Sequence, residues 1–275
     1  DVLEEGMPIT VLDRRDGRGS LSVRRQRPRG RYRTAAVMCT LEKRGGLFVL
    51  ALTGDDEHRL TPFFIDSIRS SLSQAKSQAT RGSVLITVAQ GRFFSNGFDL
   101  PPRSSAATLS EVQDYLSHRV QAFKSLVADL ISLPMPTVAA VTGHASAAGF
   151  LLAISHDYVL MRRDRGVLYM SELDLGVPLP DYFTAVIKTK IGTAGARRDV
   201  VLRAEKLRAE EAVKRGIVDS AHDSAESTVE AAMRLGEQLA GRKWDGRVYA
   251  EIRKSLCTEL CGTLGLADQT AVSRL

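Results

Sequence analysis

The chain has 275 residues, of which 44% are hydrophobic and 25% are charged, a composition typical of a globular protein with a sizeable core. The formal net charge is +6, but residues 1–37 hold nine arginines against five acidic residues, which leaves only +2 for the rest of the chain. This balance gives no support for a nucleic-acid-binding role of the part that folds.

Cysteine spacing and hydropathy argue against two further classes. Cys39, Cys257 and Cys261 fit neither a disulfide framework nor paired metal-binding spacing, and an odd number of cysteines favours a reducing compartment. The longest apolar run, residues 137–161, contains two histidines and an aspartate, so we expect no membrane span there.

Residues 1–37 show neither helical nor strand periodicity and include the run R-R-Q-R-P-R-G-R-Y-R. Such a segment cannot bury enough apolar surface to offset the entropy of ordering, so we expect a disordered, Arg-rich extension. Its acidic residues argue against an organelle transit peptide. We expect the natural chain to begin at Met38, and a genuine extension is the alternative.

Regular patterns follow residue 37 and alternate between strand and helix. Residues 47–53 and 83–89 are largely apolar and predict strands. Residues 63–79 have helical periodicity, with Thr61 as a possible cap and Pro62 in the first turn. This alternation predicts an α/β protein in which helices cover a sheet.

Two later segments have the features of a ligand site. The loop F-F-S-N-G-F-D-L at residues 93–100 follows a predicted strand, where a doubly covered sheet presents ligands. After a predicted helix over 109–133, a strand over 137–142 leads through a small-residue turn into an apolar helix from Gly149. That turn aims backbone N–H groups outward, near the positive end of a helix, and predicts an oxyanion site. A buried strand and helix packed through small residues is the alternative.

Acidic residues follow this turn in apolar surroundings. Glu172 and Asp174 lie among apolar neighbours, and Asp181 follows two prolines. Carboxyl groups in such surroundings often have shifted pKa values, so one of them is a candidate base.

The remaining sequence is predominantly helical and predicts a C-terminal helical lobe over 223–272 beside a core over 38–222. The helical patterns cover residues 181–191, 194–203, 209–215, 224–240 and 246–260.

Three motifs together resemble the crotonase (enoyl-CoA hydratase/isomerase) superfamily over residues 38–265. F-F-S-N-G-F-D-L at 93–100 resembles the family's first oxyanion loop, F-x-x-G-x-D-(L/I). G-H-A-S-A-A-G-F-L-L-A at 143–153 resembles the second loop, G-x-A-x-G-G-G-x-x-L-A. A-E-E-A-V-K-R-G-I-V-D at 209–219 resembles A-x-E-A-x-x-x-G-L-V-D.

The resemblance implies a crotonase-like spiral of ββα units, usually assembled as trimers, that binds an acyl-CoA thioester and stabilises its enolate. It places the backbone N–H groups of Phe98 and Ala148 on the thioester oxygen. Donors placed where charge develops contribute about 3 to 4 kcal/mol each to transition-state stabilisation.

The resemblance also bears on the reaction. A hydratase's first catalytic glutamate is replaced by Leu151, whereas the second aligns with Glu172. One carboxylate favours an isomerase, which removes a proton from C2 of a 3-cis- or 3-trans-enoyl-CoA and returns it at C4, giving trans-2-enoyl-CoA in fatty acid β-oxidation. Asp181 is the alternative base, because some isomerases of the superfamily place their acid a few residues after the glycine found here at Gly176.

Binding roles follow from the same resemblance. Asn96 and Gly97 are expected to border CoA, and Arg59 and Lys254 are either contacts to its phosphates or solvated surface charges. No metal or redox cofactor is implied, since CoA is part of the substrate. An enoyl-CoA hydratase or thioesterase on the same fold, or a non-catalytic acyl-CoA-binding protein, is the alternative function.

Further segments resemble the plant peroxisomal enoyl-CoA isomerases, among them M-C-T-L-E-K-R-G from Met38 and L-Y-M-S-E-L-D-L-G from Leu168. The last three residues, 273–275, read S-R-L and resemble the peroxisomal targeting tripeptide S-K-L. This ending implies a peroxisomal location and an import receptor as a partner.

Overall fold

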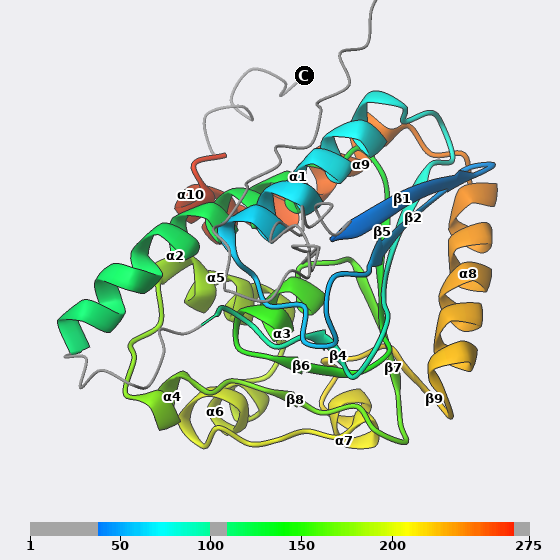
Figure 1. The fold of residues 1–275 in the computed structure, drawn as a ribbon. Helices are drawn as coiled ribbons and strands as arrows, with labels where there is room; N and C mark the ends of the chain where they lie inside the picture. Colours follow the sequence, from blue (N-terminus) through cyan, green and yellow to red (C-terminus); the bar gives the residue numbers. More distant parts are fainter. Residues whose placement is uncertain (1–37, 100–108, 267–275) are drawn as a thin grey trace, which may run out of the picture. The chain divides into compact units, whose positions relative to one another are not determined.

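A six-stranded sheet forms the centre of the fold (Figure 1). The computed structural model describes residues 38–99 and 109–266, and every structural statement below refers to these residues. The strand order is β1–β2–β3–β5–β7–β9, in which β1 and β2 are antiparallel and the other neighbours are parallel. The strands are β1 (Cys39–Arg44), β2 (Leu47–Leu52), β3 (Val84–Ala89), β5 (Thr137–Val141), β7 (Tyr158–Arg162) and β9 (Ser220–His222).

Both faces of this sheet are apolar. Val84 and Ile86 of β3 belong to the core cluster beneath α8 (Ala225–Gly241), whereas Leu85 between them belongs to the main core on the other face. Successive residues of a strand point to opposite faces, so a strand buried on both sides reads as a continuous apolar run. In Figure 1, α8 lies on one side of the sheet and α1 (Pro62–Ser77) on the other.

The helix α1 begins as its sequence predicts. The hydroxyl of Thr61 accepts a hydrogen bond from the N–H of Phe64 at 3.1 Å, and Pro62 is the first helical residue. The capping oxygen satisfies one of the N–H groups that a helix leaves without a partner at its start. This face of the sheet is also covered by α2 (Leu109–Ile131), α3 (Ala148–Ile154) and α5 (Asp181–Lys190), whose buried side chains join the main core.

A second, smaller sheet holds three parallel strands in the order β4–β6–β8. These are β4 (Phe93–Ser95), β6 (His144–Ser146) and β8 (Leu168–Tyr169). Each follows a strand of the large sheet along the chain: β4 follows β3, β6 follows β5, and β8 follows β7. With the helices after them, the strands form ββα units, so the predicted α/β class and spiral of ββα units are confirmed.

The remaining helices are α4 (Glu172–Leu175), α6 (Ala194–Leu202), α7 (Ala209–Lys214), α9 (Gly246–Leu256) and α10 (Thr258–Leu264). The single helix predicted over 246–260 is wrong, because the chain leaves helical geometry at Cys257, which separates α9 from α10. Arg253 of α9 is almost fully buried, and its guanidinium binds Asp157 at 2.6 Å and the carbonyl of Met135 at 2.6 Å. This buried contact links α9 to the segments that directly precede β5 and β7 of the large sheet.

The predicted segment boundaries after residues 37, 222 and 272 stay predictions. The expected extension at 1–37 and the targeting tripeptide at 273–275 lie outside them. Within the predicted lobe over 223–272, α8 packs on the large sheet, whereas α10 contacts α2 and α5.

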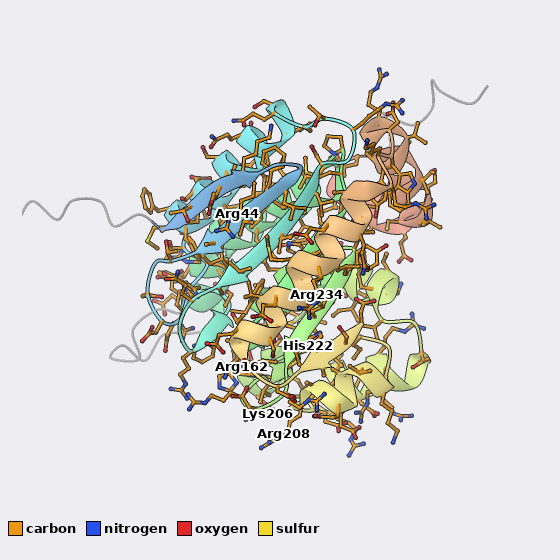
Figure 2. The ribbon with its side chains drawn as sticks, turned by 90° about the vertical axis from the view of Figure 1, so that its right-hand side faces the viewer. Arg44, Arg162, Lys206, Arg208, His222 and Arg234 are labelled. Carbon is orange, nitrogen blue, oxygen red and sulfur yellow. The ribbon has the colours of Figure 1, made fainter. Side chains whose placement is uncertain are left out.

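Several basic residues lie on the α8 side of the protein, which faces the viewer in Figure 2. Arg44 forms an ion pair with Glu42 at 2.7 Å, and Arg162 forms one with Asp164 at 2.5 Å. These pairs offset part of the positive charge on this side. Every helix within residues 38–99 and 109–266 is too short or too polar to cross a bilayer.

Candidate active site

The candidate active site lies where the three short strands end. β4 leads into Asn96, Gly97 and Phe98, β6 leads into the turn before α3, and β8 leads into α4. Parallel strands bring their carboxyl ends to the same edge of a sheet, so these three segments meet. They share a cavity of about 560 Å³. Its lining consists of Arg59, Asn96, Phe98, Leu116, Ser117, Val120, Ser146, Ala147, Tyr169, Ser171, Glu172, Leu175, Val177, Pro178, Leu179, Pro180 and Phe183.

The first loop lies directly against the second at Gly97. Gly97 has a φ of +70°, and a side-chain carbon there would lie only 2.9 Å from the carbonyl oxygen of Ser146 and 3.5 Å from the nitrogen of Ala148. Glycine therefore allows both the left-handed backbone and the close approach. The Gly97 carbonyl accepts a hydrogen bond from Leu60 N–H at 2.8 Å, which fixes the peptide that carries the Phe98 N–H.

The second loop turns sharply at Ala147. This residue has a φ of 49°, which is rare for a residue with a side chain and costs roughly 1–3 kcal/mol. Its N–H donates to the carbonyl of Tyr169 at 2.9 Å, and its carbonyl accepts the first hydrogen bond of α3, from Leu151 at 3.1 Å. The N–H of Ala148, the first residue of α3, therefore has no partner within the helix.

Phe98 supplies the second predicted donor. Its carbonyl accepts a hydrogen bond from Arg59 at 3.0 Å, whereas its N–H has no hydrogen-bond partner among residues 38–99 and 109–266. The loops thus bring Phe98, which lines the cavity, close to Ala148, which lies fifty positions further along the sequence and directly follows the lining residue Ala147. Two free N–H groups in such an arrangement suit a substrate oxygen that gains negative charge.

Glu172 is the first residue of α4 and lines the cavity. Its Oε2 atom is buried and has no hydrogen-bond partner among the described residues. Burial raises the pKa of this carboxyl, and hydrogen bonds from the backbone of Glu172 and Ser171 offset only part of the increase. A carboxyl whose pKa is raised toward neutrality is suited to take up and return a proton.

The alternative base lies in different surroundings. Asp181 is the first residue of α5, is exposed, and does not line the cavity. Leu151, at the position of the expected hydratase glutamate, is fully buried in the main core. Asp174 is exposed on α4 and does not line the cavity either, so of the three carboxyl groups that the sequence nominated the cavity contains Glu172.

The two predicted cationic contacts differ as well. Arg59 lies at the cavity, where its guanidinium binds the carbonyls of Asn96 and Phe98 and pairs with Glu57 at 2.7 Å. Lys254 lies on α9, almost fully buried, with its Nζ 2.9 Å from Glu251 Oε1, and it does not line the cavity.

Asp99 holds the end of the first loop in place. Its carboxylate binds Arg119 of α2 through two hydrogen bonds of 2.7 Å and accepts a third from the hydroxyl of Tyr115 at 2.9 Å. The Arg119 hydrogen bond lowers the pKa of this carboxyl, so Asp99 stays ionised. It braces the loop against α2.

The histidine in the apolar segment after α3 is structural. His156 is fully buried, with its ring hydrogen-bonded to Thr87 at 2.8 Å and to the carbonyl of Leu152 at 3.0 Å. Burial lowers its pKa to about 4, so the ring is neutral at physiological pH. No group of three or more His, Cys, Asp or Glu side chains within 38–99 and 109–266 is arranged to hold a metal ion.

Sequence reasoning did not identify five polar or aromatic residues of the lining, namely Ser117, Ser146, Tyr169, Ser171 and Phe183. Ser146 and Tyr169 pair with each other at the ends of β6 and β8. The sequence signal available for these two was position: Ser146 lies just before the second loop, and Tyr169 lies just before Glu172. Strands of two or three residues, however, have no recognisable periodicity.

Comparisons with known proteins agree with this geometry. Residues 49–261 match the enoyl-CoA hydratase/isomerase family. Two proteins of Arabidopsis thaliana, named "Enoyl-CoA delta isomerase 2, peroxisomal" and "Enoyl-CoA delta isomerase 1, peroxisomal", are 61% and 58% identical over 230 residues. These alignments cover 83% of this chain and 96% and 93% of the relatives.

Solved structures share the fold. An enoyl-CoA hydratase/isomerase family protein from Pseudomonas syringae superposes with a TM-score of 0.72 at 22% identity, covering 86% of this chain and 98% of the other. An enoyl-CoA hydratase from Mycobacterium marinum superposes with a TM-score of 0.71 at 20% identity, covering 86% and 99%.

The burial of Glu172 predicts an effect on stability. A carboxyl whose pKa is higher in the folded than in the unfolded protein binds its proton more tightly when folded, so its contribution to stability is lost as pH rises through the folded pKa. We expect Glu172→Gln to have a higher free energy of unfolding than the wild type at pH 7. This difference should shrink as the pH falls toward about 4.3, the pKa of a glutamate in the unfolded chain.

Urea unfolding at several pH values measures this difference. Glu230→Gln, a change on the exposed surface of α8, is the control and should alter stability by about 0.5 kcal/mol or less. The prediction would be contradicted if Glu172→Gln were less stable than the wild type at pH 7, by the same free energy of unfolding as at pH 4.

Proposed function

The chain belongs to the enoyl-CoA hydratase/isomerase family, and from this premise we propose that it is an enoyl-CoA delta isomerase that converts 3-cis- or 3-trans-enoyl-CoA into trans-2-enoyl-CoA in fatty acid β-oxidation. The observation that carries the proposal is the position of Glu172. Among the residues that line the cavity in the described part of the chain, it is the only carboxylic acid, and it shares the cavity with Phe98 and Ala147.

The proposed mechanism uses one base and two backbone donors. Glu172 removes a proton from C2 of the 3-enoyl thioester, and the electrons move onto the thioester oxygen. The N–H groups of Phe98 and Ala148 bind this oxygen and stabilise the enolate. Glu172 then returns the proton at C4, which leaves the double bond between C2 and C3. No cofactor is needed, because CoA is part of the substrate.

Two features favour isomerisation over hydration. Hydration in this family ordinarily uses two glutamates on one water molecule, and the first of these positions is the buried Leu151. The cavity wall beside Glu172 is largely apolar, with Val120, Leu179 and Phe183 among its lining residues. An apolar wall suits an acyl chain and disfavours water near the enolate.

The proposed contacts to CoA are supported by the position of the first loop at the cavity. Asn96 and Gly97 lie in the first loop at the cavity, and the Arg59 guanidinium lies beside them. Lys254 remains a prediction, since its ammonium pairs with Glu251 away from the cavity of this chain.

Isomerase activity and its base are tested together. The purified protein should convert a 3-enoyl-CoA into the conjugated 2-enoyl-CoA, with a rise in absorbance from conjugation. Because Glu172 carries the proton in the proposed mechanism, Glu172→Gln should lower kcat by about 10²- to 10⁴-fold. Asp181→Asn, which changes an exposed carboxyl outside the cavity, should retain wild-type turnover.

Each alternative gives a different result in the same assay. Full turnover by Glu172→Gln together with a loss in Asp181→Asn would assign the base to Asp181. Hydration of a 2-enoyl-CoA would indicate a hydratase, release of free CoA a thioesterase, and tight binding without turnover a non-catalytic acyl-CoA-binding protein.

A homotrimer is proposed as the assembly, with the helices of the predicted lobe over 223–272 at the interface. Support comes from a stripe of exposed apolar side chains on and just before α9, at a spacing of four residues. The stripe consists of Trp244, Val248, Ile252 and Leu256, which are 37%, 56%, 57% and 80% exposed. Exposed apolar stripes of this kind mark interaction surfaces.

Sedimentation of the purified protein tests the assembly. The wild type should sediment at about three times the chain mass of 30.0 kDa, and Ile252→Glu should shift it toward the monomer, because a charge would be buried in the interface. Leu202→Glu changes an exposed leucine outside the stripe and serves as the comparison. A wild type that is monomeric at micromolar concentration would rule the trimer out.

A peroxisomal location is proposed from the names of the Arabidopsis relatives and from the terminal S-R-L. An import receptor that reads a C-terminal tripeptide would be the partner. Deleting residues 273–275 from a fluorescent fusion should move the protein from peroxisomes to the cytosol. Unchanged peroxisomal fluorescence after the deletion would contradict the proposal.

A further inference from the structure

One side-chain hydrogen bond joins the two loops that carry the proposed oxyanion donors. The hydroxyl of Ser146, the last residue of β6, donates to the side-chain oxygen of Asn96, the first residue after β4, at 2.8 Å. Ser146 lies two residues before Ala148, and Asn96 lies two residues before Phe98. The bond therefore links the loops at equivalent positions, two residues before each donor.

The backbone pairing of these strands is weak at this edge. β4 and β6 have three residues each, and their register shifts between Phe93 and Ser95, where the ladder is irregular. An irregularity of this kind disrupts the ladder locally and alters the twist of the strand. The strands alone thus leave the relative position of the two loops poorly determined beyond Ser95.

Asn96 also contacts Glu57 and Arg59. Its N–H donates to the carbonyl of Glu57 at 2.8 Å, and Arg59 pairs with the Glu57 carboxylate while it binds the carbonyls of Asn96 and Phe98. The pKa of the Glu57 carboxyl is lowered chiefly by the hydrogen bond from Arg59, with a smaller contribution from the Asn96 side chain. Asn96 is therefore held by its backbone N–H, by its carbonyl and by its side-chain oxygen.

Within residues 38–99 and 109–266, Ser146 has no hydrogen-bonded base that would make it a nucleophile. It is almost fully buried, and its hydroxyl proton is directed to an amide oxygen rather than to a histidine or carboxylate. Nucleophilic serines need an adjacent base to accept that proton. The contact of Ser146 with Asn96 is thus suited to holding geometry.

From these contacts we propose that Ser146 and Asn96 are positioning residues, whose hydrogen bond sets the separation between the N–H groups of Phe98 and Ala148. The inference rests on the proposed isomerase function, because it concerns the site that would stabilise the enolate. Oxyanion donors act at about 2.7–3.1 Å from the developing charge, and a displacement of about 1 Å can lower a rate by about 100-fold.

The main test is Ser146→Ala, which removes the donor and leaves both N–H groups in the chain. We expect kcat for a 3-enoyl-CoA to fall by about 10- to 100-fold, with KM changed by less than about threefold, because the donors act mainly on the enolate. Asn96→Ala should lower kcat by a similar factor, with a higher KM because its proposed CoA contact is lost as well. The kcat of the double variant should fall no further than that of either single one, since both remove the same bond.

A second measurement tests the oxyanion site in the absence of turnover, through the fraction of a bound ligand that is present as its enolate. A bound 3-oxoacyl-CoA has an acidic C2 position, and its enolate absorbs in the near ultraviolet. Ser146→Ala should bind this ligand with a smaller enolate fraction than the wild type. Ser155→Ala is the matched control: Ser155 is equally buried at the far end of α3, and its hydroxyl donates only to the Leu151 carbonyl at 2.7 Å. It should leave kcat and the enolate fraction unchanged.

The outcomes separate this inference from the proposed function. An active wild type, together with a folded Ser146→Ala that keeps kcat within twofold or changes KM alone, overturns the positioning role and leaves the isomerase intact. Additive losses in the double variant also overturn it. If the wild type lacks turnover, the enolate fraction decides: a decrease in Ser146→Ala supports the positioning role, and an unchanged or absent enolate signal refutes it. Should Ser146→Ala fail to fold, Asn96→Ala is judged by its kcat and its enolate fraction.

Discussion

The parallel alignment of β4, β6 and β8 is the constraint on which the candidate site depends. Their carboxyl ends meet at one edge, so the first loop, the second loop and Glu172 enter one cavity although they lie along nearly eighty positions of sequence. The large sheet makes this possible, because each short strand continues from a long buried one. Shifting one short strand by a residue would move a donor or the base out of the cavity.

The site combines stabilising contacts with local costs. Ala147 has an unfavourable positive φ, and Glu172 buries a carboxylate oxygen with no partner among the described residues. Such costs are tolerated where the surrounding structure fixes the backbone in place. Here that support comes from the Tyr169 carbonyl on one side of the turn and from the apolar core beneath α3 on the other. The strained and unpaired groups lie where the proposed chemistry takes place.

The chemistry of the cavity follows from which carboxyl groups reach it. Leu151 lies in the core and Asp181 on the surface, so Glu172 is left to act with the two backbone donors. One base that removes and returns a proton moves a double bond, whereas addition of water ordinarily needs a second group to activate it. The proposed Ser146–Asn96 link adds a requirement on geometry, since a single base can work only if the enolate oxygen is held at a fixed distance.

The sequence by itself determined the α/β class, the start of α1 at Thr61, the order of the two loops and the candidate carboxylates. These features depend on local composition and on periodicity within six or more residues. Tertiary structure alone decided the short strands β4, β6 and β8, the break at Cys257, and the choice of Glu172 over Asp181 as the carboxyl in the cavity. A strand of two or three residues has no period to detect. Burial arises only when the chain has folded, and so does a hydrogen bond between residues fifty positions apart, such as Ser146 and Asn96.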